Sequence, residues 1–480
     1  MQDRTAKARR REEALLEDLR EGRPMPPRAG LSLVWLLSLP TILAELSAIL
    51  MEYIDAAMVG RIGAEGAAAI GLVASSTWLF WGVLRAASTG FSVLVAQEIG
   101  ARRFRSARSI LAQGLAASTA VAAAAGLAGA AIAPALPRWL GGSEAIAADA
   151  TRYFLLYMLA LPVLQVPVLC SRMLQAAGDM RTAGAVNVLM CALDVVFNFL
   201  FIFPSRTWQV AGLALRVPGL GLGVAGAAAG TVAAEAVAGA VAAWALLARQ
   251  PLLGLRRGER PRLERSVLLQ AARIGLPVGL ESAAMTGAMV AATAIVAPLG
   301  TVALAANSFA ITAESLCYMP GYGIGSAATT LVGQAIGAGR AALARRFGWI
   351  CTGAGVAAMS ATGALLWVFA PEAMALLTPD PDVQAAGARV LRIEAFAEPF
   401  FAASIVAGGA LRGAGDTLVP SLLNLASMWG VRIPLAAWLV ARHGLAGAWI
   451  AMAAELCVRG LLFLGRLGRA EGIWRPRRGG

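Results

Sequence analysis

Three carboxylates lie within one apolar run near the start of the chain, residues 31–63. Glu52 and Asp55 are three residues apart and Glu45 precedes Glu52 by seven, so the spacing predicts that all three lie on one side of a helix. A carboxylate at membrane depth costs on the order of a few kcal/mol unless it faces protein, water or an ion. A helix with such a stripe is a candidate relay for protons or ions.

A second polar stripe lies in the apolar run 181–204. Asn187, Asp194 and Asn198 are spaced by seven and four residues, which again predicts one face of a helix. Further polar candidates for a central cavity lie later in the chain. Asn307, Glu314 and Tyr318 share a stripe, and Glu394 and Glu398 are one turn apart. Arg389 and Arg392 stand near the last pair. The alternative interpretation is that these arginines neutralise the two glutamates and that the group is structural.

The composition indicates a polytopic membrane protein. Of 480 residues, 58% are hydrophobic and only 14% are charged, and the mean hydropathy is +0.69. The net charge of +13 would suggest nucleic acid binding in a soluble protein, but here the basic residues cluster in short loops, which favours a role in membrane orientation. The five cysteines lie in apolar runs without CxxC spacing and are interpreted as structural thiols. A single histidine, His443, excludes a histidine-based metal cluster.

Twelve apolar segments are long enough to span a bilayer, which predicts an all-α protein of twelve transmembrane helices. Most Lys and Arg residues lie in alternate loops and in both tails, so we expect both termini in the cytoplasm. Residues 1–30 are charged and lack an apolar core of the right length, so we expect no cleavable signal peptide. The expected spans are near 31–58, 67–98, 106–135, 150–175, 181–204, 221–248, 267–298, 302–336, 344–370, 384–411, 417–441 and 444–467.

An internal repeat at an offset of 237 residues divides these spans into two halves. LVAQEIGA at 94–101 matches LVGQAIGA at 331–338, and LQAAGD at 174–179 matches LRGAGD at 411–416. Each half has six spans, so the halves are predicted to be two lobes related by a pseudo-two-fold axis along the membrane normal, enclosing a central cleft. The expected organisation is a tail, an N-lobe, a linker, a C-lobe and a second tail, at 1–30, 31–248, 249–266, 267–467 and 468–480.

The chain resembles the MATE (multidrug and toxic compound extrusion) transporters over roughly residues 31–467. The resemblance rests on YIDAAMVGRIG, GFSVLVAQEIGAR, LQAAGDMRT, MPGYGIGSAATTLVGQAIGAG and LRGAGDTLVP. It implies a secondary antiporter of the bacterial cytoplasmic membrane that exports organic compounds, often cationic, against inward H⁺ or Na⁺ movement. It also implies a small-molecule substrate, multidrug efflux and no cofactor beyond the coupling ion; we expect a monomer.

The resemblance also implies roles for particular residues. Asp55 matches the acid of the first helix that binds the coupling ion in many bacterial members. The family often has Asn at the 194 position and Asp at the 198 position, and here they are exchanged. A site of Asp55, Asp194 and Asn198 offers oxygen acceptors and one amide, which suits H⁺ or Na⁺ and not a transition metal. Glu52 either shares a proton with Asp55 or caps a polar cavity.

Other acids receive roles by the same resemblance. Glu281, four residues after Pro277, matches a helix that carries an ion-binding or substrate-binding acid in some members. With the repeat offset, Asp55 corresponds to Ala292 and Asp194 corresponds to Val431. The coupling site is therefore predicted in the N-lobe alone.

Two other function classes fit the sequence less well than an antiporter. A flippase for a lipid-linked or specialised metabolite would have a cationic cavity, whereas the cavity helices here carry more acids than unpaired cations. An enzyme is not expected, because HExxH, a Ser/Lys pair and a histidine cluster are missing from the sequence. A P-loop is also missing, so direct ATP drive is not expected. Residue types alone do not separate H⁺ from Na⁺ coupling.

Overall fold

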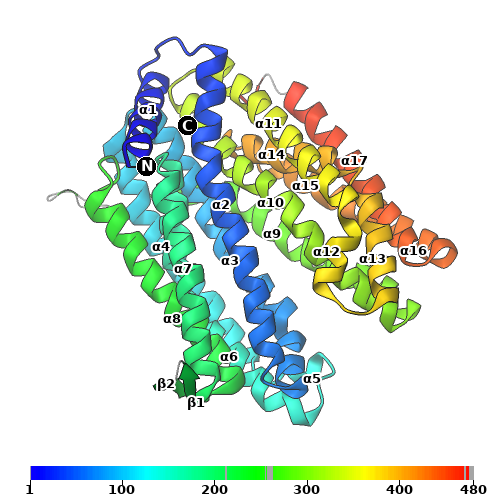
Figure 1. Cartoon of the computed structure of the whole chain (residues 1–480). Coiled ribbons are helices and arrows are strands. Elements are labelled where there is room, and N and C mark those ends of the chain that lie inside the picture. Colours follow the sequence, from blue (N-terminus) through cyan, green and yellow to red (C-terminus); the bar gives the residue numbers. More distant parts are fainter. Residues whose placement is uncertain (1, 211–212, 255, 257–262, 470–471, 475–480) are drawn as a thin grey trace.

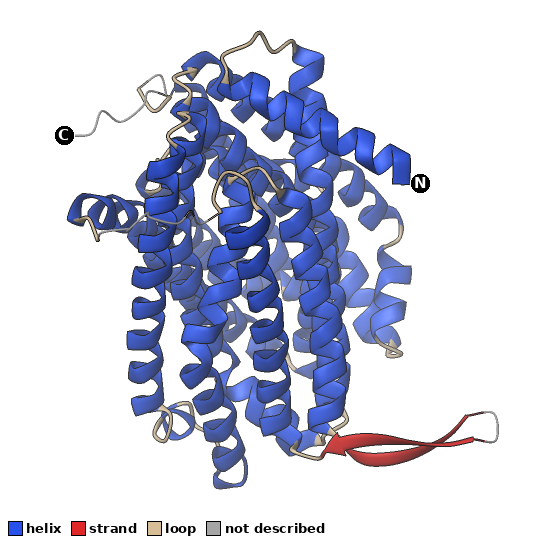
Figure 2. Ribbon diagram, turned by 90° about the vertical axis from the view of Figure 1, so that its left-hand side faces the viewer, coloured by secondary structure: helices blue, strands red, loops and turns tan. Residues whose placement is uncertain are grey.

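The computed structural model describes residues 2–210, 213–254, 256, 263–469 and 472–474. Within them, eleven continuous helical segments are long and apolar enough to cross a membrane. A twelfth span consists of two shorter helices in line, interrupted at residues 395–397. The first helix of the chain and the end of the last span lie at one end of the bundle (Figure 1), here called the terminal end, and a β-hairpin marks the opposite, hairpin end (Figure 2).

The N-terminal half forms one lobe and the C-terminal half forms the other, as the repeat predicts. The N-lobe spans are α2 (Pro27–Gly60), α3 (Ala64–Gly100), α4 (Phe104–Ile132), α6 (Glu144–Ala176), α7 (Met180–Ile202) and α8 (Gly223–Trp244) with the π-helical turn η1 (Ala245–Arg249). The C-lobe spans are α9 (Arg265–Val296), α10 (Thr301–Gly337), α11 (Ala341–Val368), α13 and α14 (Pro381–Glu394 and Glu398–Gly413), α15, η3 and α16 (Leu418–Ser427, Met428–Arg432 and Ile433–His443), and α17 (Leu445–Arg469).

Short elements complete the chain. An N-terminal helix, α1 (Gln2–Arg20), precedes the first span, and α5 (Leu136–Trp139), η2 (Ala297–Leu299) and α12 (Ala370–Leu377) lie in loops. Strands β1 (Pro204–Val210) and β2 (Leu213–Leu220) pair antiparallel, with Arg206 opposite Val217 and Val210 opposite Leu213. The fifth span ends at Ile202, two residues before the expected end at 204, and the hairpin that follows it is not predicted by the sequence.

The repeat is visible in the backbone. Gly178 and Gly415, which the offset of 237 matches, both adopt left-handed φ angles of 89° and 82° after the fourth and tenth spans. Only glycine takes such angles at little cost, which explains the GAGD sequence. The following aspartates then differ, because Asp179 caps α7 by accepting from the Thr182 N–H (3.1 Å), whereas Asp416 pairs with Arg466 (3.0 Å).

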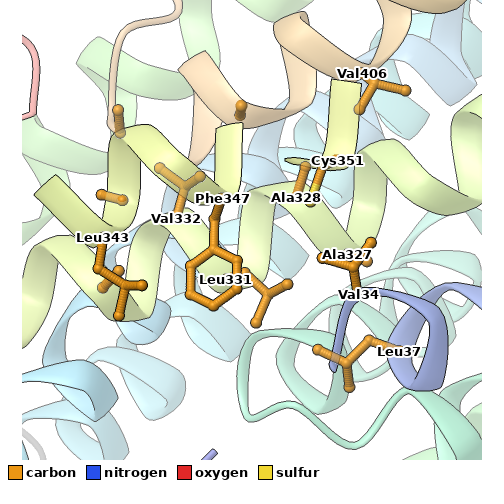
Figure 3. Packing of buried hydrophobic residues seen from close by; sticks show 14 of the residues in the cluster. Val34, Leu37, Ala327, Ala328, Leu331, Val332, Leu343, Phe347, Cys351 and Val406 are labelled. Atoms are coloured by element: carbon orange, nitrogen blue, oxygen red, sulfur yellow. The ribbon is translucent and has the colours of Figure 1, made fainter. Parts of the chain in front are cut away.

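The two lobes meet along a seam at the terminal end. Val34 and Leu37 of α2 pack among Ala327 and Leu331 of α10 and Phe347 of α11 (Figure 3). Helices in lipid associate through close packing rather than through a hydrophobic drive, and glycines provide it here. Gly100 packs on the backbone carbonyl of Gln334, and Gly337 packs on that of Gln97, so the matched ends of α3 and α10 cross in backbone contact.

Candidate functional site

The first and fifth spans bring three of the predicted residues together inside the N-lobe. The Asn198 side-chain amide donates to Asp55 Oδ1 at 3.0 Å and to Asp194 Oδ2 at 2.9 Å. Asp194 is fully buried and Asn198 is 2% exposed, whereas Asp55 is half-buried. The spacing of four residues places Asp194 and Asn198 one turn apart on the face of α7 that contacts α2. One amide group therefore bridges two carboxylates from different helices.

Two further oxygens of this site are buried without a hydrogen bond in the described part of the chain, Asp194 Oδ1 and Asn198 Oδ1. Gly230 of α8 packs directly against Asn198 Oδ1 and closes the site on that side. Two neighbouring carboxylates repel each other in a medium of low dielectric constant. The arrangement suits a proton or a hard monovalent cation, which prefers oxygen ligands, and the described residues contain no cluster of His, Cys, Asp and Glu suited to a heavier metal.

A further acid, Glu235, lies near this site and is absent from the predicted residues. It is on α8, 7% exposed, and within Coulomb range of Asp194. It forms no hydrogen bond or ion pair with the described residues. Its signal in the sequence is a lone carboxylate inside the Ala- and Gly-rich span 223–244, which carries the same burial cost as the acids of the first span.

The three acids of α2 lie in different surroundings. Glu52 is exposed and makes no hydrogen bond with a described residue, although it is within Coulomb range of Asp55. Glu45 is half-buried and lies within Coulomb range of Arg85 on α3 and Arg172 on α6. A step of three residues turns a helix by about 300°, so Asp55 is rotated by about 60° from Glu52, enough to face α7.

Buried acids of the C-lobe form a second cluster. Glu314 is 5% exposed, and Glu394 and Glu398 are fully buried on either side of the break between α13 and α14. The four carboxyl oxygens of the helix-break pair have no hydrogen-bond partner among the described residues. The predicted neutralising partners are wrong for this pair, because Arg389 and Arg392 are exposed, and Arg392 instead packs on Trp367 and donates to its carbonyl.

The cations that face this second cluster come from the eleventh and twelfth spans. Arg459 pairs with Glu455 at 3.0 Å and stacks over the Phe401 ring at 5.3 Å. Arg432, in the π-helical turn η3, lies within Coulomb range of Glu314, Glu394 and Glu455. Four carboxylates therefore face two guanidinium groups, and the cluster is neutral only when protons or cations supply two more charges.

Several other predicted cavity residues hold helices together within one lobe. Asn187 donates to the Ala44 carbonyl at 2.9 Å, and Asn307 accepts from the Trp449 indole at 3.0 Å. The offset of 237 residues matches Asn187 to Asn424 and Ala44 to Glu281. The contact is repeated in the C-lobe, because Asn424 donates to Glu281. Glu281 also accepts from the Ser421 hydroxyl at 2.6 Å. Tyr318 is half-buried and packs edge-on against Tyr322 and Phe401.

Between the lobes lies a cavity of about 790 Å³ with a mostly apolar lining. It is bounded by α3 and α9, toward the hairpin end, and its lining includes Ser75, Trp78, Met285, Thr286, Met289 and Thr293. Elsewhere between the helices, Arg172 lies within Coulomb range of Arg85, Glu45 and Arg412. The side chains of these three arginines form no ion pair or hydrogen bond with the residues that the structure describes.

Comparison with known proteins places the chain in a family. The family model MatE matches residues 40–200 and 277–438. The "Probable multidrug resistance protein NorM" of Thermotoga maritima is 28% identical over 92% of this chain and 92% of its own length. The protein of the same description in Pseudomonas aeruginosa is 32% identical over 90% of this chain and 88% of its own.

Solved structures agree in fold. "Crystal structure of MATE in the straight conformation" describes a structure that aligns with a TM-score of 0.84 at 21% identity, covering 92% of this chain and 97% of that one. Another, described as the "outward-facing conformation of a multidrug resistance MATE family transporter", aligns with a TM-score of 0.84 at 21% identity, over 92% of this chain and 96% of that one. With its twelve spans in two repeated lobes and its two matched segments, this chain belongs to the MATE family of membrane transporters.

Proposed function

We propose that this transporter is a secondary active antiporter that exports amphipathic organic cations in exchange for H⁺ or Na⁺. The observation that carries the proposal is the buried Asp55–Asn198–Asp194 site, in which two carboxylates from two helices share one amide. No other charge compensates the pair by an ion pair within the described residues. A site of this kind is stabilised by one proton or one monovalent cation, and its occupancy changes the charge of the N-lobe.

The direction of transport follows from the charge distribution. The basic tails and loops of the terminal end favour a cytoplasmic location for that end, in the inner membrane of a bacterium. The lobe contacts at the terminal end then close the cytoplasmic side, and the cavity between α3 and α9 lies toward the outside. An ion that enters the N-lobe from outside cancels negative charge, weakens the attraction for a cationic substrate, and releases it outward. The small-molecule substrate and the bilayer are the only partners required, and a monomer suffices.

The test is transport by purified protein in proteoliposomes with a proton gradient and a sodium gradient imposed separately. Asp55→Asn and Asp194→Asn should each lower gradient-driven substrate uptake at least tenfold. Asp149→Asn is the matched control, because Asp149 is an exposed carboxylate that pairs only loosely with Arg152 at 3.8 Å. No transport under either gradient, or undiminished transport by the Asp55 variant, would refute the proposal.

A second candidate is export of a compound with an anionic group, such as a lipid-linked metabolite. The observation that favours it is an excess of positive charge around Arg172. Among the described residues, Arg172 interacts electrostatically with Arg85 and Arg412 but with one carboxylate, that of Glu45. Unpaired arginines bind carboxylate and phosphate groups well. Arg172→Met should lower transport of an anionic substrate and leave that of a cationic dye unchanged. The reverse result would favour the cationic proposal.

A further inference from the structure

The N-terminal helix α1 lies outside the twelve spans and runs across the ends of both lobes (Figures 1 and 2). Its sequence is mostly charged, yet Leu16 is 5% exposed and Leu19 is fully buried. Met25, in the connection to α2, is 6% exposed. These three side chains belong to the apolar cluster along the lobe seam. The helix is therefore docked on the bundle through an apolar edge.

On the N-lobe side, α1 contacts the turn after α6 and the end of α3. Leu16 packs against Gly178, and Glu12 pairs with Arg181 at 2.9 Å. Arg102, just after α3, pairs with Glu21 at 3.3 Å and with Glu17 at 3.7 Å. The first two contacts are largely buried, whereas the Arg102 pairs are half-exposed and contribute less.

On the C-lobe side, two arginines hold backbone carbonyls at and beyond the end of α1. Arg340, at the start of α11, donates to the carbonyls of Asp18 and Leu19, both at 3.2 Å. Arg346 donates to the Met25 carbonyl at 2.9 Å. The last carbonyls of a helix lack partners within the helix, and a cation there is favoured by the helix dipole.

Arg20 joins the two sides through a single side chain. Its Nη2 donates to the Ala177 carbonyl of the N-lobe at 3.1 Å, and its Nε donates to Gln334 Oε1 of the C-lobe at 3.1 Å. Gln334 in turn donates to the Ala176 carbonyl at 2.8 Å, across the seam. The Arg20 side chain is 7% exposed, so these bonds lie inside the interface.

From these contacts we infer that α1 is a clasp that holds the lobes together at the terminal end and must release one lobe before that end can open. Separation of Ala177 from Gln334 breaks the double contact of Arg20, because one guanidinium cannot span both once the lobes part. The clasp favours the conformation closed at the terminal end and sets how often the transporter opens there. This role rests on the proposed antiport, for which the two ends of the bundle must open in turn, but it concerns conformation and not the transported compound.

The experiment measures the distance between the lobe ends by pulsed electron spin resonance. Spin labels are placed at Arg105→Cys on α4 and Ala342→Cys on α11, both exposed, in protein whose five buried or half-buried cysteines are replaced by alanine. Arg20→Met removes the double contact. Arg9→Met is the matched control, because Arg9 pairs with Glu13 on the same helix while both side chains are largely exposed.

The Arg20 variant should raise the ratio of long to short distances about tenfold, which corresponds to about 1.4 kcal/mol. Arg340→Met, which removes the two C-lobe bonds to the Asp18 and Leu19 carbonyls and leaves Arg20 in place, should shift the ratio in the same direction. The clasp is refuted if both variants give the distance distribution of the Arg9 control. Because the measurement needs neither substrate nor gradient, its outcome is independent of a failure of the transport proposal.

Discussion

Removing the amide that bridges Asp55 and Asp194 gives the sharpest test of the N-lobe site. Asn198→Ala removes two hydrogen bonds to carboxylates, of 3.0 and 2.9 Å, and leaves room beside Gly230 instead of overfilling it. Hydrogen bonds to charged groups contribute roughly 1.5–3 kcal/mol each. Because Asp55 is half-buried and solvent weakens its bond, the lower end of that range applies, and the loss should be about 3 kcal/mol.

Asn187→Ala provides a matched control on the same helix. Asn187 makes one bond, to the neutral carbonyl of Ala44 at 2.9 Å, so its loss should cost about 1 kcal/mol. The entropy of unfolding scales with chain length, so for a chain of this size each kcal/mol lowers the melting temperature by only about 1 °C. We therefore expect a decrease of about 3 °C for the Asn198 variant and about 1 °C for the Asn187 variant.

The assay is thermal unfolding of detergent-purified protein, followed by tryptophan fluorescence with and without sodium. The Asn198 variant should also lose most of its gradient-driven transport, whereas the Asn187 variant should keep it, because only the first substitution changes the carboxylate pair. Equal melting temperatures for the two variants would contradict the bridging role of Asn198. So would full transport by the Asn198 variant.

Three further predictions concern the surroundings of the sites. Glu235→Gln should weaken the affinity for the coupling ion about fivefold without loss of folding, because it removes a buried carboxylate that interacts electrostatically with Asp194. The affinity is measured by transport at increasing concentrations of the ion. Burial raises the pKa of Glu12 to about 7 against the opposing charge of Arg181, with a small raising contribution from Asp179 and Glu13. Between about pH 4.5 and 7 the folded protein then holds more protons than the unfolded one, so stability falls as pH rises through that window, and Glu12→Gln should flatten this slope in melting curves. Gly337→Ala should lower transport severalfold and make the seam accessible to a maleimide probe, because the added Cβ meets the Gln97 carbonyl. Gly353→Ala is the control and should change neither transport nor labelling, because the space around Gly353 is open.

The architecture follows from the sequence because it depends on local signals. Apolar length predicts each span, and the repeat predicts two lobes and the paired turns at Gly178 and Gly415. The same reasoning brings Asp55, Asp194 and Asn198 onto two helix faces, and the structure brings those faces together; their role in coupling stays a prediction. Glu52 lies outside this site because of the rotation of α2 about its axis, which residue spacing alone does not determine.

The remaining features depend on contacts between segments distant in the sequence. The predicted cavity residue Glu281 binds Asn424. The predicted neutralisation of Glu394 by Arg392 fails because a step of two residues on one helix turns the side chains about 200° apart, and the exposed Arg392 donates to the Trp367 carbonyl. The docking of α1 depends on Arg340, more than three hundred residues away. A charged helix with a few leucines does not reveal such a partner, because its local pattern is the same whether it is docked or solvated.

The crossing of α3 and α10 at Gly100 and Gly337 bears on how the protein avoids a leak. Each glycine lies directly against a carbonyl of the other helix, so the space between the two chains is too small even for a methyl group. A file of water molecules, along which protons would hop, does not fit through such a crossing. Under the proposed antiport, this crossing removes one path by which the ion gradient could leak through the closed end between transport cycles.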